Sequence, residues 1–311
     1  MRERPTLHAL AVYLAVVDHG TMRAAAEHES ISQPAISAHV KSLERFFHTP
    51  LLERSSRRVR PTAAGELVAD YSRRMLALMD ELEQGLADLA GLHTGRLVVG
   101  ASSSYGEAIL PGILGRFHQL HPGIDLAARI GNTEEIIQGV LDRTFGFGII
   151  GADRPNAALE SWPISDDTLD LFVAPSHPLR ARTTLATHDL STETFVLREP
   201  GSATRDLALR TLAIHGVVPI RLIEFEGNEA VKRAVAAGMG VGILSEHTLA
   251  VDYRAGEIVR LICADWECRR QFCVLHRYDW MLSRAERAFL ELLGRAPPVA
   301  HIVTRSRKRD S

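Results

Sequence analysis

The sequence contains few cysteines. There are three in 311 residues, and an odd number disfavours a framework of disulfide bonds. They are Cys263, Cys268 and Cys273, and their C-x4-C-x4-C spacing matches no common zinc-binding pattern. We expect ordinary thiols in strands or loops, and redox or metal sensing is the less favoured alternative.

Long hydrophobic runs are also missing. The apolar stretch at residues 9–17 is followed by no signal-peptide cleavage pattern. It is also shorter than the ~18 residues that suggest a membrane-spanning helix. We therefore expect no membrane partner and a cytoplasmic location. The length and the 46% hydrophobic content predict a folded protein of two or three domains.

The motifs of several enzyme classes are absent. Residues 100–104 read GASSS and lack the last glycine of a G-x-S-x-G nucleophile elbow. Residues 238–242, GMGVG, have the wrong spacing for a dinucleotide fingerprint and join a predicted helix to a strand, the reverse of a phosphate loop. No H-E-x-x-H site and no G-x-x-x-x-G-K loop occurs. The sequence predicts no enzyme, no cofactor and no metal.

The net charge is small but unevenly distributed. A total of −2 argues against a generic polyanion binder. Residues 1–64 hold nine Arg and Lys against six Asp and Glu, a net of +3, so that the remainder carries −5. If nucleic acid is the partner, this asymmetry points to the N-terminal part.

Three short helices are predicted in that part, over residues 5–20, 21–27 and from 32 onward. The first has an apolar stripe of Leu7, Leu10, Leu14 and Val17. Gly20 ends it, and Thr21 is a good N-cap for the second. Three short helices with tight connections are typical of a helix-turn-helix unit.

The third helix lies in the stretch SISQPAISAHVKSLE, residues 30–44. Its apolar stripe is Ile36, Val40, Leu43 and Phe47, and its opposite face carries Pro34, Ala38, Lys41 and Arg45. That face is small enough to enter a DNA major groove. Gln33, Ser37, His39 and Lys41 can donate to base edges or phosphates, and Ala38 can approach a thymine methyl. The alternative is a surface helix of an ordinary α domain.

Two further N-terminal segments follow. Residues 51–61, LLERSSRRVRP, predict a basic hairpin with Arg54, Arg57, Arg58 and Arg60, suited to be the wing after a recognition helix. A solvated charged loop is the alternative. From Thr62 a long helix is predicted, with the apolar seam Leu67, Tyr71, Met75, Leu78, Leu82, Leu86 and Leu89. Such a seam must be buried, and a second copy of the helix is the expected partner.

From residue 96 strands and helices alternate. Strands are predicted at 97–101, 124–130, 145–150, 169–174, 194–197, 220–225, 241–244, 258–262 and 271–276. Helices are predicted at 107–120, 132–141, 204–214, 229–237 and 283–293. The alternation predicts βαβ units, a parallel sheet and two α/β halves with a cleft.

Three hydroxyl-rich loops follow strands in these halves. They contain Ser102, Ser103 and Ser104, then Asn132 and Thr133, then Gly201, Ser202, Ala203 and Thr204. Hydroxyls and free N–H groups at helix N-termini bind anions, and α/β ligands bind where strands end. Arg198 and Arg205 are candidate countercharges. We predict a small anionic metabolite, and plain helix capping is the alternative for each loop.

Residues 7–66 resemble the N-terminal domain of LysR-type transcriptional regulators. The resemblance is carried by LAVVDHGTMRAAAEHESISQPAISAHVKSLERFFHTPLLERSSRRVRPTAAGE, which includes the third helix and the wing. Three positions depart from the family pattern. His48 replaces a usual glycine, Leu52 a usual phenylalanine and Met22 a usual aromatic residue. The first two concern the turn from helix to wing, and therefore the orientation of the wing.

The resemblance extends over nearly the whole chain and implies a multi-domain architecture. Residues 1–61 would be a winged helix-turn-helix, 62–91 a linker and dimerisation helix, and 92–296 a two-lobed α/β domain like periplasmic binding proteins. Lobe one would take about 96–165 and 265–296, lobe two about 166–264, and 297–311 would be a disordered tail. Phrases such as GNEAVKRAVAAGMGVGILSEHTLA are similar to the branch that regulates carbon-fixation operons.

The resemblance also implies partners. These are a pseudo-palindromic double-stranded DNA operator, a small-molecule effector, one or three further copies of the chain, and RNA polymerase as a further candidate. The DNA-binding candidates become Thr21, Arg23, Ser32, Gln33, Pro34, Ser37, Ala38, His39, Lys41, Arg54, Arg57 and Arg58. The effector candidates are Ser102, Ser103, Ser104, Asn132, Thr133, Arg198, Ser202 and Thr204. The rival hypothesis is a metabolite-binding protein whose basic helix serves a protein partner.

Overall fold

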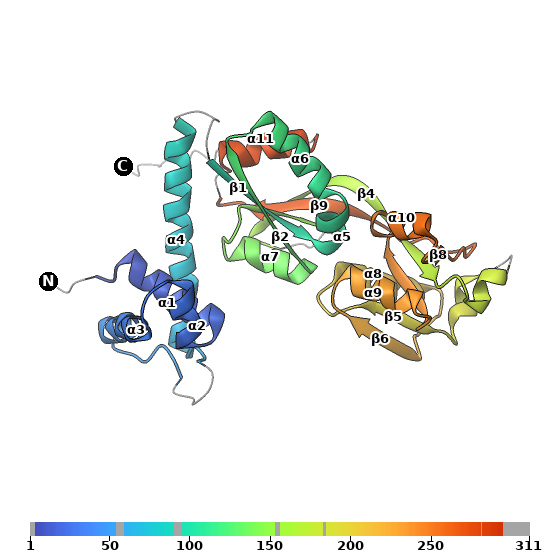
Figure 1. Ribbon diagram of the computed structural model, residues 1–311, viewed down its shortest axis with the longest axis horizontal. Coiled ribbons are helices and arrows are strands. Elements are labelled where there is room, and N and C mark those ends of the chain that lie inside the picture. Colours follow the sequence, from blue (N-terminus) through green and yellow to red (C-terminus); the bar gives the residue numbers. More distant parts are fainter. Residues whose placement is uncertain are drawn as a thin grey trace, which may run out of the picture. The chain divides into compact units, whose positions relative to one another are not determined.

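The computed structural model describes residues 4–53, 59–89, 95–152, 156–182, 185–280 and 282–294. They form two compact units, of which the first comprises the described residues up to Leu89 with Asp142–Thr144, and the second the other described residues. Figure 1 shows that the first unit is helical and that the second combines helices with a sheet.

The first unit contains four helices in its described residues. They are α1 Leu7–His19, α2 Met22–His28, α3 Gln33–Phe47 and α4 Ala63–Leu89. Thr6, Thr21 and Ser32 each accept a hydrogen bond from the backbone N–H three residues further on. These bonds satisfy donors that the start of a helix leaves unpaired. The predicted three-helix pattern is present, and its helix starts are set by hydroxyl caps.

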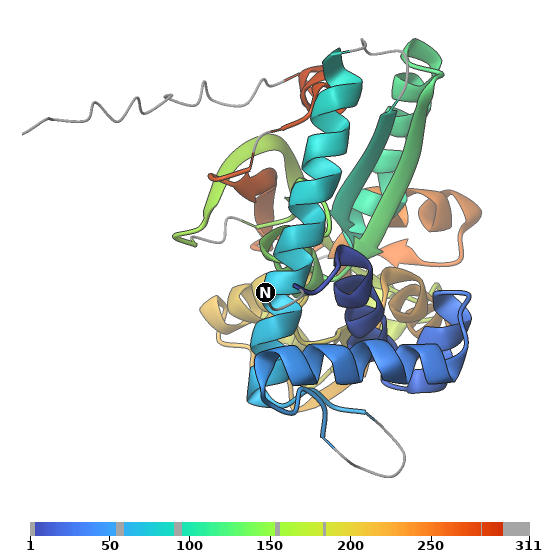
Figure 2. The same ribbon diagram turned by 90° about the vertical axis from the view of Figure 1, so that its left-hand side faces the viewer.

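A single apolar core holds the first unit together. Its fully buried side chains include Val12, Tyr13, Val16, Ala25, Ile36, Leu43 and Leu51. The Tyr13 hydroxyl donates to the Leu51 carbonyl at 3.3 Å, and burial raises the pKa of Tyr13 to about 12. A Cβ at Gly65 would lie 2.0 Å from the same carbonyl oxygen, so only glycine lets α4 start here. Helix α1 packs against α4, and α2 and α3 pack against α1 and each other (Figure 2).

The turn from α3 toward the wing is made by a strained residue. His48 has φ 54° and ψ 31°, the left-handed conformation, and caps α3 by donating its N–H to the Glu44 carbonyl. This conformation costs a residue with a Cβ about 1–2 kcal/mol, which explains the usual preference for glycine at such a position. The departure at His48 therefore leaves the turn geometry in place at a cost in stability.

We expect His48→Gly to raise the free energy of unfolding by about 1 kcal/mol, because glycine adopts this conformation without steric strain. Urea unfolding of the wild-type protein and of His48→Gly, compared at equal m-values, measures the change in the free energy of unfolding. His39→Gly is the contrasting variant, since it lies within α3 and should destabilise. If both variants destabilise alike, His48 is not strained.

The second unit is built on one sheet in the described residues. Its strand order is β2-β1-β3-β9-β4-β7-β5-β6, and β8 pairs with β4. The strands are β1 Gly95–Ser102, β2 Ile124–Gly131, β3 Phe147–Ile150, β4 Leu159–Val173, β5 Thr194–Arg198, β6 Arg221–Phe225, β7 Val241–Ser245, β8 Val259–Arg260 and β9 Arg269–Arg277. The helices are α5 Ser103–Ala108, α6 Leu110–Leu120, α7 Thr133–Leu141, α8 Ala203–Ile214, α9 Asn228–Ala236, α10 Glu246–Ala255 and α11 Arg284–Leu292, with short 3-10 turns at Pro178–Ala181 and Thr187–Leu190.

The sheet divides into two lobes joined by β4 and β9. We call the part built on β2, β1 and β3 lobe one, and the part built on β7, β5 and β6 lobe two (Figure 1). Strand β4 pairs with β9 from Leu159 to Thr168 and with β7 from Leu169 to Phe172. One continuous strand therefore passes from one lobe to the other.

The prediction of a parallel sheet is wrong for the middle of the molecule. The pairs β1–β2, β1–β3, β5–β6 and β5–β7 are parallel, but β3–β9, β9–β4 and β4–β7 are antiparallel. The two strands that join the lobes cause this, because each runs against the βαβ strands beside it. The part of β4 before Leu169 and the helix α10 were not predicted, and the strand expected at 258–262 is only the two residues of β8.

Each lobe has its own apolar core. Phe117, Phe147, Phe272 and Phe289 are fully buried in lobe one, and Phe195 and Leu212 in lobe two. Helices α6, α7 and α11 pack on lobe one, and α8 and α9 pack on lobe two. The loops after β1, β2 and β5 meet at the junction of the two cores.

Candidate functional site

The face of α3 that was predicted to meet DNA is open to solvent. Gln33, Pro34, Ala38 and Lys41 are exposed, and Ser37 and His39 are half-buried. On the opposite side Ile36, Val40 and Leu43 are buried in the core. The apolar stripe therefore anchors the helix while small polar groups remain available, which is the arrangement that a major-groove helix requires.

Three other DNA-binding candidates already have local partners. The Thr21 and Ser32 hydroxyls accept from the Ala24 and Ala35 N–H groups at 3.1 and 3.3 Å. Arg23 forms an exposed ion pair of 3.0 Å with Glu27. Such an exposed pair contributes little and can open toward another anion.

Only the base of the wing lies within the described residues. Leu52 and Pro61 form an antiparallel bridge, and the Glu53 N–H donates to the Arg60 carbonyl at 2.8 Å. Arg54, Arg57 and Arg58 lie outside the described residues.

The apolar seam of α4 is uncovered in the single chain. Six of its side chains are each between 48 and 60% exposed: Leu67, Tyr71, Met75, Leu78, Leu82 and Leu86. The side chain of Leu89 is not among those that the structure describes. At its N-terminal end the seam borders a cavity of about 580 Å³ lined by Leu10, Phe46, Phe47 and Val68, among others. Phe47 is 40% exposed there, so it does not share the burial of the other stripe residues.

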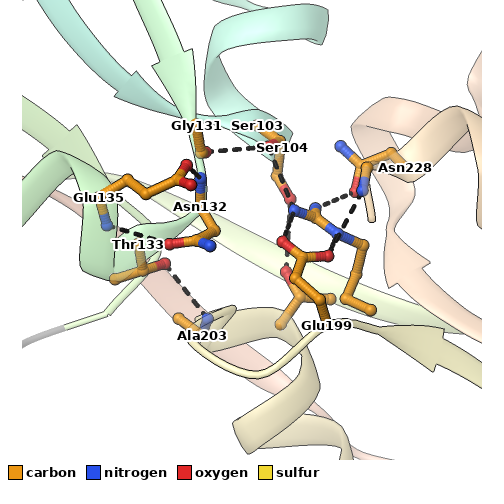
Figure 3. Close-up of polar contacts among 12 residues, drawn as sticks. Ser103, Ser104, Gly131, Asn132, Thr133, Glu135, Glu199, Ala203 and Asn228 are labelled. Atoms are coloured by element: carbon orange, nitrogen blue, oxygen red, sulfur yellow. Dashed lines mark hydrogen bonds and ion pairs between the residues drawn. The ribbon is translucent and has the colours of Figure 1, made fainter. Parts of the chain in front are cut away.

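Residues from both lobes meet in a buried polar cluster (Figure 3). The Ser104 and Thr204 hydroxyls lie 3.4 Å apart, and the Ala203 N–H donates to the Thr133 hydroxyl at 3.2 Å. Both contacts join lobe one to the N-terminal end of α8. Ser103, Ser104, Thr133 and Thr204 are all buried. The structure therefore brings together the three loops that the sequence singled out.

The predicted countercharges already have acidic partners. Arg198 donates to both carboxylate oxygens of Glu199 at 2.7 Å, and also to Asn228 at 2.7 Å and Ser103 at 3.2 Å. Burial raises the pKa of Glu199, but the hydrogen bonds and charge of Arg198 outweigh it and lower the pKa overall. Arg205 pairs with Glu224. Neither arginine carries an unbalanced charge.

The remaining effector candidates differ in how they are used. The Asn132 side chain accepts from the Glu135 N–H at 3.0 Å, and the Glu135 carboxylate accepts from the Asn132 N–H at 2.8 Å, a reciprocal cap of α7. Ser102 and Ser202 are buried at the starts of α5 and α8, and neither hydroxyl caps its helix.

A second buried pair at the junction was missed by the sequence analysis. Arg270 donates from Nε to Asp167 at 2.7 Å and from Nη1 to Thr204 at 3.0 Å. Burial lowers the pKa of the Arg270 guanidinium, and the charge and hydrogen bond of Asp167 oppose that shift. The two residues are 103 positions apart, and no local pattern in the sequence pairs them.

The three cysteines are buried thiols that form no disulfide bond. Burial raises the pKa of the Cys263 thiol to about 11 and also raises that of Cys268, whose sulfur accepts a hydrogen bond from Thr211. A thiol that stays protonated at neutral pH is a poor nucleophile, which supports the prediction of ordinary thiols.

The described residues form neither a cluster of metal ligands nor a helix that could cross a membrane. No group of three or more His, Cys, Asp and Glu is placed to hold a metal ion in the part of the chain that the structure describes. Among the described helices, none combines the length and apolar character needed to cross a bilayer.

Both units are similar to known protein families. Residues 7–66 match the family described as bacterial regulatory helix-turn-helix protein, lysR family, and residues 90–297 match the LysR substrate binding domain. The transcriptional regulator CfxR of Cupriavidus necator is 34% identical over 300 residues, which cover 93% of this chain and 94% of CfxR. The RuBisCO operon transcriptional regulator of Allochromatium vinosum is 32% identical over 288 residues, covering 93% and 95%.

Solved structures of similar proteins include a regulatory domain and a full-length regulator. The regulatory domain of CcmR from Synechocystis PCC6803, in complex with 2-PG, is 30% identical with a TM-score of 0.59 and covers 64% of this chain and 96% of its own. Full-length CbnR in complex with its target DNA has a TM-score of 0.69 over 93% of this chain and 99% of its own. At 22% identity, that likeness shows the fold alone.

Proposed function

The chain belongs to the LysR family of bacterial transcriptional regulators, and from this premise we propose that it binds a pseudo-palindromic operator as a homo-oligomer and responds to a small anionic metabolite. The family consists of regulators, so we propose no enzymatic activity. We also propose a cytoplasmic location, because a regulator of this kind acts on the chromosome.

The observation that carries the DNA-binding proposal is the polar face of α3. Gln33, Ala38 and Lys41 are exposed above a stripe that is buried in the unit's own core. CbnR, which shares the fold, has been solved on its target DNA. The rival hypothesis, a protein partner for α3, has no comparable support.

The oligomer is supported by the uncovered seam of α4. Burying a leucine side chain stabilises a protein by about 1.5–3 kcal/mol, so an isolated helix with this seam would be unfavourable in water. A second copy of α4 presents the same seam, and a two-fold pair places two α3 helices on two half-sites. A tetramer and a contact with RNA polymerase follow from the family resemblance alone.

The effector proposal rests on the buried cluster between the lobes. The CcmR regulatory domain, 30% identical, binds 2-PG, which makes this compound the first ligand to test. A ligand that contacts both lobes would favour one of their relative orientations over others.

The decisive experiment is selection of genomic fragments by the purified protein, followed by sequencing, with and without 2-PG. We expect enrichment of one pseudo-palindromic site whose affinity falls steeply with salt. A flat profile in both conditions, at physiological salt, would favour the protein-partner hypothesis. Enrichment beside carbon-fixation genes would support the branch assignment.

We expect Arg58→Ala to weaken binding to all DNA sequences about equally and to reduce the slope of log affinity against log salt by about 1, because a wing arginine contacts phosphate. Fluorescence anisotropy on operator and scrambled duplexes at several salt concentrations measures both effects. A change in sequence preference would show instead that Arg58 contacts bases.

A further inference from the structure

Arg270 lies where the two lobes are joined. In the pairing of β9 with β4, Arg270 lies opposite Asp167. Two residues after Asp167, at Leu169, β4 changes its partner strand from β9 to β7. The Arg270 side chain is 6% exposed and that of Asp167 is 0% exposed. Its guanidinium packs against lobe one, since a Cβ on Gly151 would lie 2.6 Å from the Arg270 Cζ. The same group contacts lobe two through Thr204.

One donor of this buried guanidinium has no partner. Nε donates to Asp167 and Nη1 to Thr204, but Nη2 is buried without a hydrogen-bond partner among the described residues. A carboxylate commonly takes two parallel bonds from a guanidinium. Here the second oxygen of Asp167 accepts from the Ser245 hydroxyl at 2.6 Å and not from Nη2. The bond to Ser245 thus holds the carboxylate in an orientation in which only one of its oxygens meets the guanidinium.

A buried donor left unpaired is costly, so an acceptor is expected at Nη2. The neighbouring groups suit an anion. The Thr204 hydroxyl accepts from Arg270 and is thus free to donate to the Ser104 hydroxyl, which lies 3.4 Å from it. Thr204 of lobe two therefore contacts the guanidinium directly, and Ser104 of lobe one lies next to Thr204. The other arginine of the cluster, Arg198, is already held by both oxygens of Glu199.

We propose that Arg270 Nη2 is the cationic contact for a carboxylate or phosphate group of the effector, and that Asp167 and Ser245 position this guanidinium. The inference rests on the proposed effector function and assigns its anion contact. A ligand held there adjoins Thr204 in lobe two and Ser104 in lobe one, so that binding fixes the lobes at the strand pair that joins them.

The test is calorimetric titration of the full-length protein with 2-PG, with inorganic phosphate and succinate as separate probes for the two anionic groups. Arg270→Lys keeps the charge but removes the fork of donors, and we expect the Kd for 2-PG to rise at least about tenfold. Ser245→Ala should also raise it, because Asp167 is then free to pair with Nη2 and compete with the ligand. Arg269→Lys is the matched control, because Arg269 is the preceding residue in β9 and its own side chain is 75% exposed.

The outcomes separate this inference from the proposed function. A weaker Kd in both Arg270→Lys and Ser245→Ala, with Arg269→Lys unchanged, supports it, and the probe that loses binding in Arg270→Lys identifies the group. Unchanged binding of 2-PG by Arg270→Lys or by Ser245→Ala would mean that the ligand does not depend on Nη2 as these residues hold it, which overturns the inference and leaves the effector proposal standing. If the wild-type protein binds none of the three probes, the anionic-effector proposal fails and the inference with it.

Discussion

Ser37→Asp should abolish specific operator binding. Ser37 lies in the second turn of α3, half-buried beside the exposed Gln33 and Lys41. A carboxylate there would face phosphates and base edges, and like charges brought together cost several kcal/mol. A loss of about 3 kcal/mol corresponds to a fall in affinity of ~100-fold, because every 1.4 kcal/mol is a factor of ten.

Electrophoretic mobility shifts on the selected operator measure this effect. Ser37→Ala removes the hydroxyl without adding charge and should cost far less, about 1 kcal/mol. Ser191→Asp makes the same chemical change at an exposed position of the second unit and should leave operator binding intact. Circular dichroism should show the same helix content in all variants. Retained operator footprinting by Ser37→Asp would show that α3 is not the recognition helix.

The first unit was predictable because its signals are local. Hydroxyl caps at Thr6, Thr21 and Ser32 mark helix starts, and a stripe with helical period marks the face that is buried. The family matches confirm the resemblance that these residues carry. Phe47 and Leu7 were exceptions, because each is 40% exposed although it belongs to a predicted apolar stripe.

The sheet was less predictable because its pairing is not local. The part of β4 before Leu169 contains Pro163, Asp166 and Asp167, which are unfavourable in strands, so the sequence did not predict its extended conformation. It is a strand because β9, more than 100 residues away, pairs with it. The antiparallel direction of both strands follows from joining two lobes, which no alternation of strands and helices reveals.

The candidate effector cluster was predicted in part for the same reason. Loops that start helices can be predicted from sequence, so Ser104, Thr133 and Thr204 were identified, and the structure brings them together. Whether an arginine of the cluster is neutralised cannot be predicted from sequence, because it depends on which carboxylate faces that arginine in the fold. Glu199 neutralises Arg198 from the next position, whereas Asp167 reaches Arg270 only across a strand pair.

The double substitution Leu78→Glu with Leu82→Glu should convert the protein to monomers and lower operator affinity by about 100-fold. Both leucines are 54% exposed in the single chain and stand in the middle of the seam. Facing a second copy of α4, they would place four carboxylates in an apolar interface, where burial of unpaired charge is strongly unfavourable. A monomer would then hold one half-site where the dimer holds two.

Sedimentation equilibrium and mobility shifts on the same samples measure the two losses. Leu78→Met with Leu82→Met is the matched control, because it keeps an apolar seam of similar volume and should preserve both assembly and binding. The glutamates lie on a face of α4 that the first unit's core does not use, so the thermal stability of each folded unit should change little. If the glutamate variant still dimerises, the copies associate through another surface. If it becomes monomeric but binds the operator with unchanged affinity, recognition does not need two α3 helices. Loss of both together is the result expected if the seam sets the spacing at which two α3 helices meet the two half-sites.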